Sequence, residues 1–545
     1  MKIRAIALVV IILLAAIVIN GQQSELGKVD FPTSGSPAAQ ASFLRGVAAL
    51  HSFWYEEALD AFRESTKTDP DFMMGYWGEA MTYNHPLWSE QDTPAARLVV
   101  AKIKDNPKLT ARERAYLDAV KALYGEGDKR ARDEAYSAAM EKVYRAYPDD
   151  LEAAAFYALS LLALAPDGKS YRLQAKAGAI AFDVYQRNPN HPGAAHYIIH
   201  AFDDPDHAIL ALPAARRYAS IAPEAHHARH MPSHIFLQLG MWPEAAASNE
   251  SAWEASDAWM KRKQLSPSVR DYHSLHWLLY VYLQQGRYKK AEELLALMKQ
   301  TMSGPTYDNK LRPGYYENSY SNMAAAFVIE TERWNLADTL FSENGTQTGA
   351  TADGANGHGA HSGMMASTSD QTATLRVSNA GGRLPLFTRR FAAAMSGRGS
   401  EAMFGSAGSS GAINDLEVGA VAALAMNNHA AALELMKKAV ASEDEQGPPS
   451  GPPSLIKPAH ELYGELLLKA GKPKEAAEQF KISLRRQPNR ARSLLGAARA
   501  AAQNGDRAVA TAVYTKLLDQ WQQADPDLPE LREARDYVKQ TSPRP

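Results

Sequence analysis

The sequence predicts an all-α protein, built as a solenoid of repeated helix pairs. Two observations support this fold class. From about residue 39 the chain is rich in alanine and carries apolar residues at helical spacing, whereas alternating β-branched runs are rare. A pattern of glycine, alanine, an aromatic ring and proline also recurs along the chain. Such recurrence is typical of proteins in which each helix pair packs on its neighbours.

The recurring pattern has the skeleton of the tetratricopeptide unit, which is about 34 residues long. Two copies are complete: Gly46, Ala58, Phe62 and Pro70 form the first, and Gly464, Ala476, Phe480 and Pro488 form the second. Weaker copies contain Ala245 with Asn249, Ala291, Ala432, and Ala510 with Tyr514. A small alanine is needed where the helices of a hairpin touch, a ring fills the space one turn later, and proline ends the second helix.

The first 21 residues have the features of a secretory signal peptide. Lys2 and Arg4 precede an unbroken apolar run of 15 residues, from Ala5 to Ile19. This run is shorter than the ~20 residues that a membrane-spanning helix usually needs. We therefore expect an exported protein located in the periplasm. The alternative is an uncleaved N-terminal anchor that attaches the chain to the inner membrane.

Composition divides the remainder of the chain. Residues 22–38 are polar and rich in Gly, Ser and Pro, so we expect a linker. Residues 39–340 are predicted to form an N-terminal solenoid, and residues 412–540 a smaller C-terminal array of repeats. Between the two, residues 341–411 are rich in Gly, Ser, Thr and Ala, a composition typical of a flexible insert. A short helix is expected within this insert, around residues 384–395.

Charge and cysteine content exclude several classes of function. The 59 Lys and Arg residues balance 61 Asp and Glu residues, and this argues against a nucleic-acid partner, which requires a basic surface. The chain has no cysteine, so disulfides, cysteine zinc sites and iron–sulfur clusters are excluded. The sequence also lacks a P-loop, a Rossmann glycine pattern, an H-E-x-x-H motif and a nucleophile elbow.

The spacing of the histidines is the most informative feature of the sequence. Ten of the 16 histidines lie between His191 and His276. Pairs 34 residues apart are His196 with His230, His200 with His234, and His51 with His85. Pairs 46 residues apart, which is the local repeat offset, are His227 with His273 and His230 with His276. Histidines therefore recur at equivalent positions of consecutive repeats.

These histidines predict a transition-metal site in the concave groove of the solenoid. Imidazoles four residues apart lie on one face of a helix and can share a metal ion, although Pro232 can begin a new helix between His230 and His234. The predicted ligands are His196, His200, His227, His230, His234, His273 and His276, with support from Asp203 or Asp204, and with His51 and His85 as secondary candidates.

The predicted ligands do not determine which metal binds or how many metal ions bind. Imidazole suits Zn, Cu, Fe and Ni. Seven histidines exceed what one tetrahedral site uses, so a dinuclear site and a mononuclear site with spare histidines both fit. A catalytic role is equally open. Metal-activated water for hydrolysis and a redox-active copper or iron centre are the two candidate chemistries.

Two other interpretations compete with metal binding. The first is an interaction scaffold whose groove binds a peptide or an envelope partner without metal, with the histidines as polar lining. The second is a structural histidine that duplication copied from one ancestral unit. Geometry distinguishes them, because a metal needs at least three imidazole nitrogens within about 2 Å of a common point, whereas a peptide groove spreads the histidines along its length.

Several segments together resemble a family of exported bacterial tetratricopeptide repeat proteins. They are LHSFWYEEALDAF, GYWGEAMTYNHPLW, LTARERAYLDAVKALYGEGD, HPGAAHYIIHAFDDP and HARHMPSHIFLQLGMW, within about residues 40–300. The HMPSHI motif is the most specific. The resemblance implies a periplasmic or surface solenoid whose relatives share the pair His196 and His200, the triple around His230, and the later pair His273 and His276. It implies no particular reaction, and residues 341–411 lie outside the family pattern.

Overall fold

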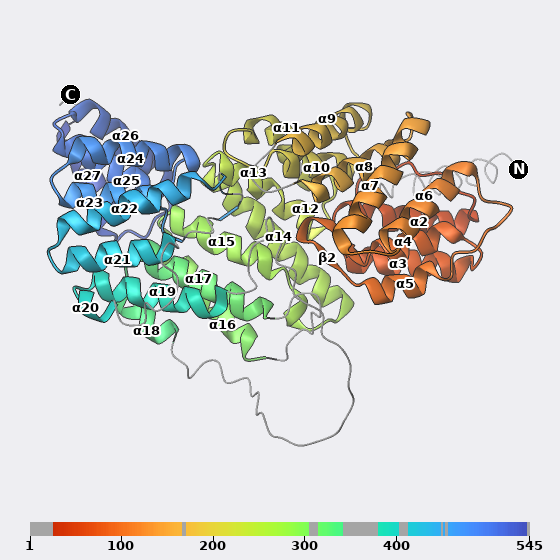
Figure 1. Ribbon diagram of the computed structural model, residues 1–545, viewed down its shortest axis with the longest axis horizontal. Helices are drawn as coiled ribbons and strands as arrows, with labels where there is room; N and C mark the ends of the chain where they lie inside the picture. Colours follow the sequence, from red (N-terminus) through yellow and green to blue (C-terminus); the bar gives the residue numbers. More distant parts are fainter. Residues whose placement is uncertain are drawn as a thin grey trace, which may run out of the picture.

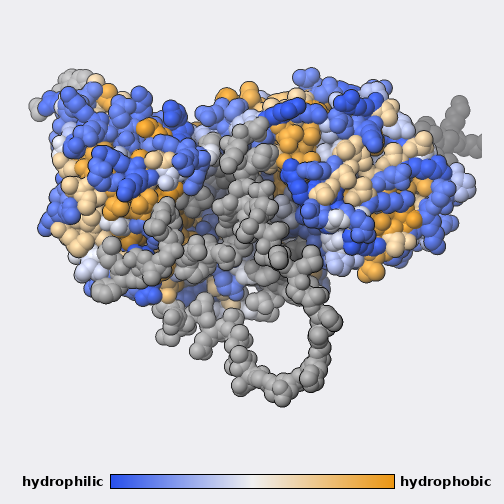
Figure 2. Space-filling view, in the orientation of Figure 1, coloured by the Kyte–Doolittle hydropathy of each residue, from blue (hydrophilic) through white to orange (hydrophobic). Residues whose placement is uncertain are grey.

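In the computed structural model the described part of the chain is all-α apart from one short β-hairpin, which confirms the predicted fold class (Figure 1). The structure describes residues 26–165, 171–304, 314–341, 380–402, 413–447, 449, 451–452 and 456–541. The predicted signal peptide and most of the predicted insert lie outside these ranges. Within them, every helix is too short or too polar to span a lipid bilayer. In the view of Figure 2, hydrophilic residues cover much of the surface at both ends of the molecule.

The N-terminal half of the array contains α2 (Pro37–His51), α3 (Tyr55–Thr68), α4 (Met73–Met81), α5 (Thr93–Val100), α6 (Ala111–Leu123), α7 (Lys129–Ala146), α8 (Leu151–Leu164), α9 (Arg172–Arg187), α10 (Pro192–Ala201), α11 (Ala208–Ile221), α12 (His226–His230) and α13 (Pro232–Gln238). Between α4 and α5 lie β1 (Asn84–His85), the 3-10 helix η1 (Pro86–Trp88) and β2 (Glu90–Gln91), and the two strands pair antiparallel.

The second half contains α14 (Trp242–Lys263), η2 (Pro267–Val269), α15 (Tyr272–Gln284), α16 (Tyr288–Met302), α17 (Tyr315–Thr331), η3 (Trp334–Leu336), α18 (Ala337–Leu340), α19 (Ala380–Met395), α20 (Gly399–Ala402), α21 (Ile413–Ala425), α22 (His429–Asp444), α23 (Ala459–Lys469), α24 (Pro473–Arg486), α25 (Ala491–Gln503), α26 (Arg507–Gln520) and α27 (Pro529–Thr541). Helix α19 begins four residues earlier than the short helix expected within the insert.

The helix hairpins pack as the repeat pattern predicts. The ring of Phe62, in α3, lies between Gly46 of α2 and Gly78 of α4. A Cβ atom at these two glycines would lie only 2.7 and 2.2 Å from the ring. Phe480 of α24 lies in the same way between the corresponding glycines of α23 and α25. Glycine in the first helix of two consecutive units thus leaves room for the aromatic ring between them.

Among the described residues, two large hydrophobic cores meet at α13, beside a small third cluster of Val328, Ala337 and Ala392. Buried residues from Leu26 to Ile235, together with Trp259, form the first core. Buried residues from Phe236 to Ala534 form the second. The core therefore changes within α13, and not at the insert where the composition of the sequence changes. Helices α17, α19 and α21 pack on one another, so the second core continues across the insert.

The residues just before α2, which we expected to be a linker, lie against the first core from residue 26 onward. Leu26 and Phe31 are fully buried. The backbone N–H of Lys28 donates to the carbonyl oxygen of Asn190 at 2.9 Å. The two apolar side chains anchor a segment whose polar composition is otherwise typical of a linker.

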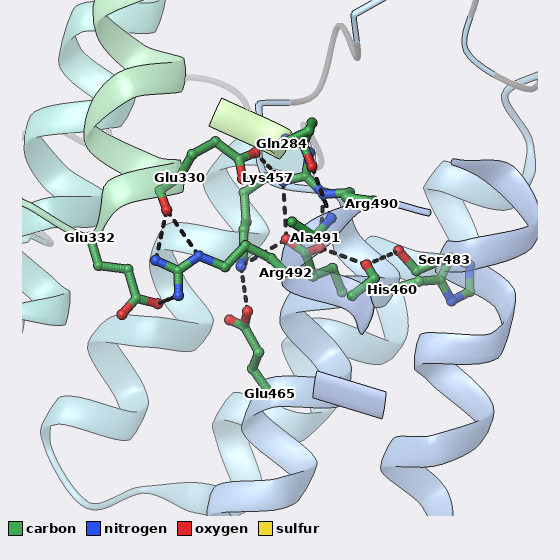
Figure 3. Close-up of polar contacts among 12 residues, drawn as sticks. Gln284, Glu330, Glu332, Lys457, His460, Glu465, Ser483, Arg490, Ala491 and Arg492 are labelled. Carbon is green, nitrogen blue, oxygen red and sulfur yellow. Dashed lines mark hydrogen bonds and ion pairs between the residues drawn. The ribbon is translucent and has the colours of Figure 1, made fainter. Parts of the chain in front are cut away.

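A buried ion network anchors the C-terminal repeats on the middle of the chain (Figure 3). Arg490, at the start of α25, is fully buried and forms ion pairs with Glu330 of α17 and Glu461 of α23. Its guanidinium also donates to the hydroxyl of Tyr280, in α15, at 3.0 Å. These contacts fix the position of α15, the helix that contributes a histidine to the candidate site.

Candidate metal centre

Six of the seven predicted ligands gather in two triads. In each triad, one ring nitrogen of every histidine lies within 4.8 Å of the others. The first triad is His196 and His200 of α10 with His227 of α12, and the second triad is His230 of α12, His234 of α13 and His273 of α15.

The two triads are copies of one another, related by the repeat. Each combines a histidine pair at i, i+4 from one unit with a single histidine from the start of the corresponding helix in the next unit. In the second triad the pair, His230 and His234, lies on either side of Pro232. Helix α13 begins at Pro232, which is the new helix start that the sequence indicated as an option. Met231, between the two short helices, keeps helical dihedral angles (φ −54°, ψ −35°), so the rings of the pair still face one another.

The series of sites ends at His276, the seventh predicted ligand. His276 and Tyr280 of α15 stand one repeat offset after His230 and His234. Tyrosine replaces the second histidine of the pair, and its hydroxyl accepts a hydrogen bond from Arg490 at 3.0 Å. Among the described residues, His276 belongs to neither triad. The structure therefore does not bring His276 together with the other six predicted ligands.

In the first triad, three Nε2 atoms converge. Nε2 of His196 lies 3.0 Å from Nε2 of His200 and 3.2 Å from Nε2 of His227. On the other side of the His196 ring, Nδ1 lies 2.7 Å from the carbonyl oxygen of His51. A carbonyl can only accept, so Nδ1 carries the proton and the lone pair of Nε2 faces the triad.

In the second triad, Nε2 of His230 and Nε2 of His234 lie 3.2 Å apart. Nδ1 of His230 donates to Oδ1 of Asn249 at 2.6 Å, and Nδ1 of His234 donates to Oδ2 of Asp203 at 2.6 Å. The amide of Asn249 is itself oriented, because its Nδ2 donates to the carbonyl of Ala245 at 2.9 Å. With both protons held on Nδ1, two Nε2 lone pairs face each other. Lone pairs this close repel unless a cation lies between them.

Burial lowers the pKa of four of these imidazoles, those of His196, His200, His227 and His230. The pKa of His196 falls to about 3 and that of His230 to about 4, because burial, and to a smaller extent the neighbouring imidazoles, disfavours the charged form. Burial also lowers the pKa of His200 and His227 well below the ordinary value for histidine. At neutral pH a proton therefore occupies the space between the nitrogens poorly. A metal ion, which binds the deprotonated nitrogen, fits it better.

Aromatic rings cover both triads. The ring centroid of Phe53 lies 4.3 Å from that of His196 and 5.7 Å from that of His227. Phe53 has φ +52°, which is uncommon for a bulky residue and is a kind of strain that often occurs at functional sites. The ring of Trp277 lies 4.1 Å from that of His234. These rings place apolar surface against the candidate ligand imidazoles.

The two candidate supporting carboxylates differ in position. Asp203 holds His234 through Oδ2, and its Oδ1 accepts from Gln238 at 3.1 Å. Asp204 instead pairs with His207 at 2.9 Å, outside the triads. Of the two, the structure therefore places Asp203 behind a predicted ligand.

The two secondary candidates lie outside the triads. His51 shares a buried carboxylate, Glu152, with His191, at nitrogen–oxygen distances of 2.6 and 3.2 Å. The remaining ring nitrogen of His51 lies 2.8 Å from the hydroxyl of Tyr197. That of His191 accepts from the N–H of Ala194 at 3.1 Å. Hydrogen bonds thus satisfy every ring nitrogen of this group.

His85, the other secondary candidate, stacks on Tyr55 with ring centroids 3.9 Å apart and pairs with Glu90 at 3.3 Å. It contributes to neither triad.

Three further residues, Asn249, Phe53 and Trp277, contact the triads and were not predicted as parts of the site. Asn249 had a detectable signal. It occupies the repeat position where Phe62 and Phe480 are aromatic, yet it is polar and fully buried. A polar residue at a core position needs a partner, and here the partner is a ligand imidazole.

Comparison with known proteins supports the repeat fold at the C-terminal end. A family model described as "Tetratricopeptide repeat" matches residues 464–529. The chain contains tetratricopeptide repeats. The crystal structure of yeast Tom70 is similar at 10% sequence identity, covering 91% of this chain and 87% of the Tom70 chain with a TM-score of 0.23. No curated protein matches the sequence.

Proposed function

We propose that this tetratricopeptide repeat protein is exported and binds transition-metal ions through the two histidine triads. One observation carries the proposal: the Nε2 atoms of His230 and His234 lie 3.2 Å apart while acceptors hold both protons on Nδ1. A metal ion turns this repulsion into coordination. Donation of the second ring nitrogen to a carboxylate, an amide or a carbonyl is the usual support of a metal-bound histidine.

The number of ligands leaves room for chemistry. Each triad supplies three protein ligands. Three protein ligands with a free fourth position are typical of catalytic zinc sites, whereas structural zinc sites use four. The proposal therefore includes a site that is open to a water molecule or a small substrate.

Burial argues against a peptide groove lined by the same histidines. His196 and His230 have no exposed surface, so a bound peptide would not reach them. A protein partner at another surface is compatible with the proposal, because stacked tetratricopeptide repeats typically form surfaces that bind proteins. Export to the periplasm rests on the N-terminal sequence, from Lys2 to Ile19. Membrane attachment applies only if that segment is retained.

Elemental analysis tests the proposal directly. The mature protein is purified from its native compartment without a histidine affinity tag, and its metals are measured by mass spectrometry. We expect near-stoichiometric transition metal, which the double variant His230→Ala, His234→Ala loses. His276→Ala is the matched control and should retain the metal. Absence of metal, with no uptake of added zinc or copper at micromolar concentration, would reject the proposal in favour of a metal-free interaction scaffold.

A further inference from the structure

The two triads lie close enough to act as one centre. Within the triads, ring centroids are 4.7 Å apart for His196 and His200 and 4.6 Å apart for His230 and His273. Between the triads, the centroids of His200 and His234 are 5.9 Å apart, as are those of His227 and His230. Rings of different triads are therefore nearly as close as rings of the same triad. Two ions, one in each triad, would share one small ligand, as in two-metal sites generally.

The donor set favours copper. The six candidate ligands are imidazoles, three for each ion, with no thiolate or carboxylate among them. Copper is the divalent ion of its series that binds such nitrogen ligands most tightly. Two carboxylates lie nearby: Asp203 accepts from Nδ1 of His234, and Asp271 pairs at 3.1 Å with His226, which is not among the six. A buried site with so little negative charge favours Cu(I), with charge +1, over a divalent ion, because burying uncompensated charge is costly.

We propose that the two triads hold a pair of copper ions that binds dioxygen between them. This inference rests on the proposed function, since it requires that the triads bind metal. Each Cu(I) would give up one electron, and dioxygen would take both to become peroxide bound between two Cu(II) ions. Copper–oxygen bonds would form and the oxygen–oxygen bond order would fall from two to one, with no proton or other group transferred. The reverse transfer releases dioxygen. Phe53 and Trp277 place apolar rings beside the imidazoles, surroundings that suit a ligand of this kind, which is small and uncharged.

The test loads the purified full-length mature chain with Cu(I) under anaerobic conditions. We expect two copper ions per chain by elemental analysis. Admission of air should produce an intense near-ultraviolet absorption band that disappears when dioxygen is removed. The oxygenated protein should give no electron paramagnetic resonance signal, because two bridged Cu(II) ions couple their spins.

Single variants test the two triads separately. His200→Ala removes a ligand of the first triad and His273→Ala a ligand of the second. Each should leave one copper per chain, abolish the absorption band and produce the signal of an isolated Cu(II) after oxidation. His276→Ala, in the same helix as His273, should keep both ions and the band. Because loss of a ring can unfold the chain, His200→Gln and His273→Gln are measured in parallel, and only monodisperse, helical protein is counted.

Three outcomes overturn the inference. One copper per chain, lost in both single variants, would mean that the histidines form a single mononuclear site, and the proposed function would stand. Two copper ions with separate Cu(II) signals and no band would mean two independent sites, and the proposed function would again stand. A chain that takes up neither copper nor zinc would reject the proposed function and the inference together.

Discussion

Asn249 decides which nitrogen of His230 faces the second triad, because Oδ1 of Asn249 accepts the proton of Nδ1 at 2.6 Å. Asn249→Leu keeps the volume and removes this acceptor. We expect metal affinity at the second triad to fall by about 10- to 100-fold, the usual cost of losing such a partner. Asn249→Asp retains an acceptor and should bind nearly as tightly as the native chain. Competition with a chromophoric chelator measures both, and equal affinity for Asn249→Leu would show that the amide does not orient the ligand.

His276 provides a prediction about pH for the metal-free protein. Burial lowers its pKa to about 4, whereas an unfolded histidine has a pKa of about 6.5. The unfolded chain therefore binds more protons between these values. The stability that depends on neutral His276 is complete above about pH 6.5 and is lost as the pH falls toward 4. In His276→Leu, the change of unfolding free energy with pH over this window should be smaller by up to about 1.4 kcal/mol per pH unit.

Chemical denaturation of both proteins at pH 7 and pH 5 provides this comparison. A variant whose stability changes with pH as steeply as that of the native chain would contradict a half-buried His276 that is neutral at pH 7. His429→Leu, at an exposed position, serves as the control and should leave the slope unchanged.

At the scale of the helices, repeat spacing predicted which helices carry the ligands. Repeat spacing could not predict how the ligands are distributed between the two triads. The pair His196 and His200 takes its third ligand from the next unit, and only the packing of α10 against its neighbours shows this. The sequence shows that Tyr280 replaces the second histidine of the repeated pair. The hydrogen bond that holds Tyr280 comes from Arg490, which is 210 positions away in the chain. Local pattern carries no information about such a contact.

The same packing makes the glycines of the repeats testable. A Cβ at Gly496, in α25, would lie 2.2 Å from the ring of Phe480. Gly496→Ala should therefore lower the free energy of unfolding by about 1–3 kcal/mol, as overpacking usually does. Adding Phe480→Leu, which shortens the side chain, should return part of the loss. Denaturation of the single and double variants tests this coupling, and purely additive losses would mean that the ring moves aside freely.

For the whole molecule, the sequence predicted a solenoid but not its division into two cores. Composition changes most sharply at residues 341–411, yet the cores meet at α13, between Ile235 and Phe236. Both triads lie close to this junction, since α13 carries His234 of the second triad and α12 carries His227 of the first. A site placed there depends on both halves of the molecule. Contacts between α13, α15 and the distant C-terminal repeats arise from the tertiary fold, and repeat spacing does not encode them.

Arg490 tests that dependence. Arg490→Met leaves Glu330 without the guanidinium that balances its buried charge, and breaking a buried pair in this way typically costs about 3–5 kcal/mol. The first core contains neither residue. Hydrogen exchange should therefore accelerate in α15, α17 and α23–α27 and stay unchanged in α2–α9. Arg398→Met, which removes an exposed pair with Glu401, should change neither region. Equal acceleration of hydrogen exchange throughout the chain would mean that the two cores unfold as a single cooperative unit. In that case the stability of both triads would depend on the C-terminal repeats, through the junction at α13.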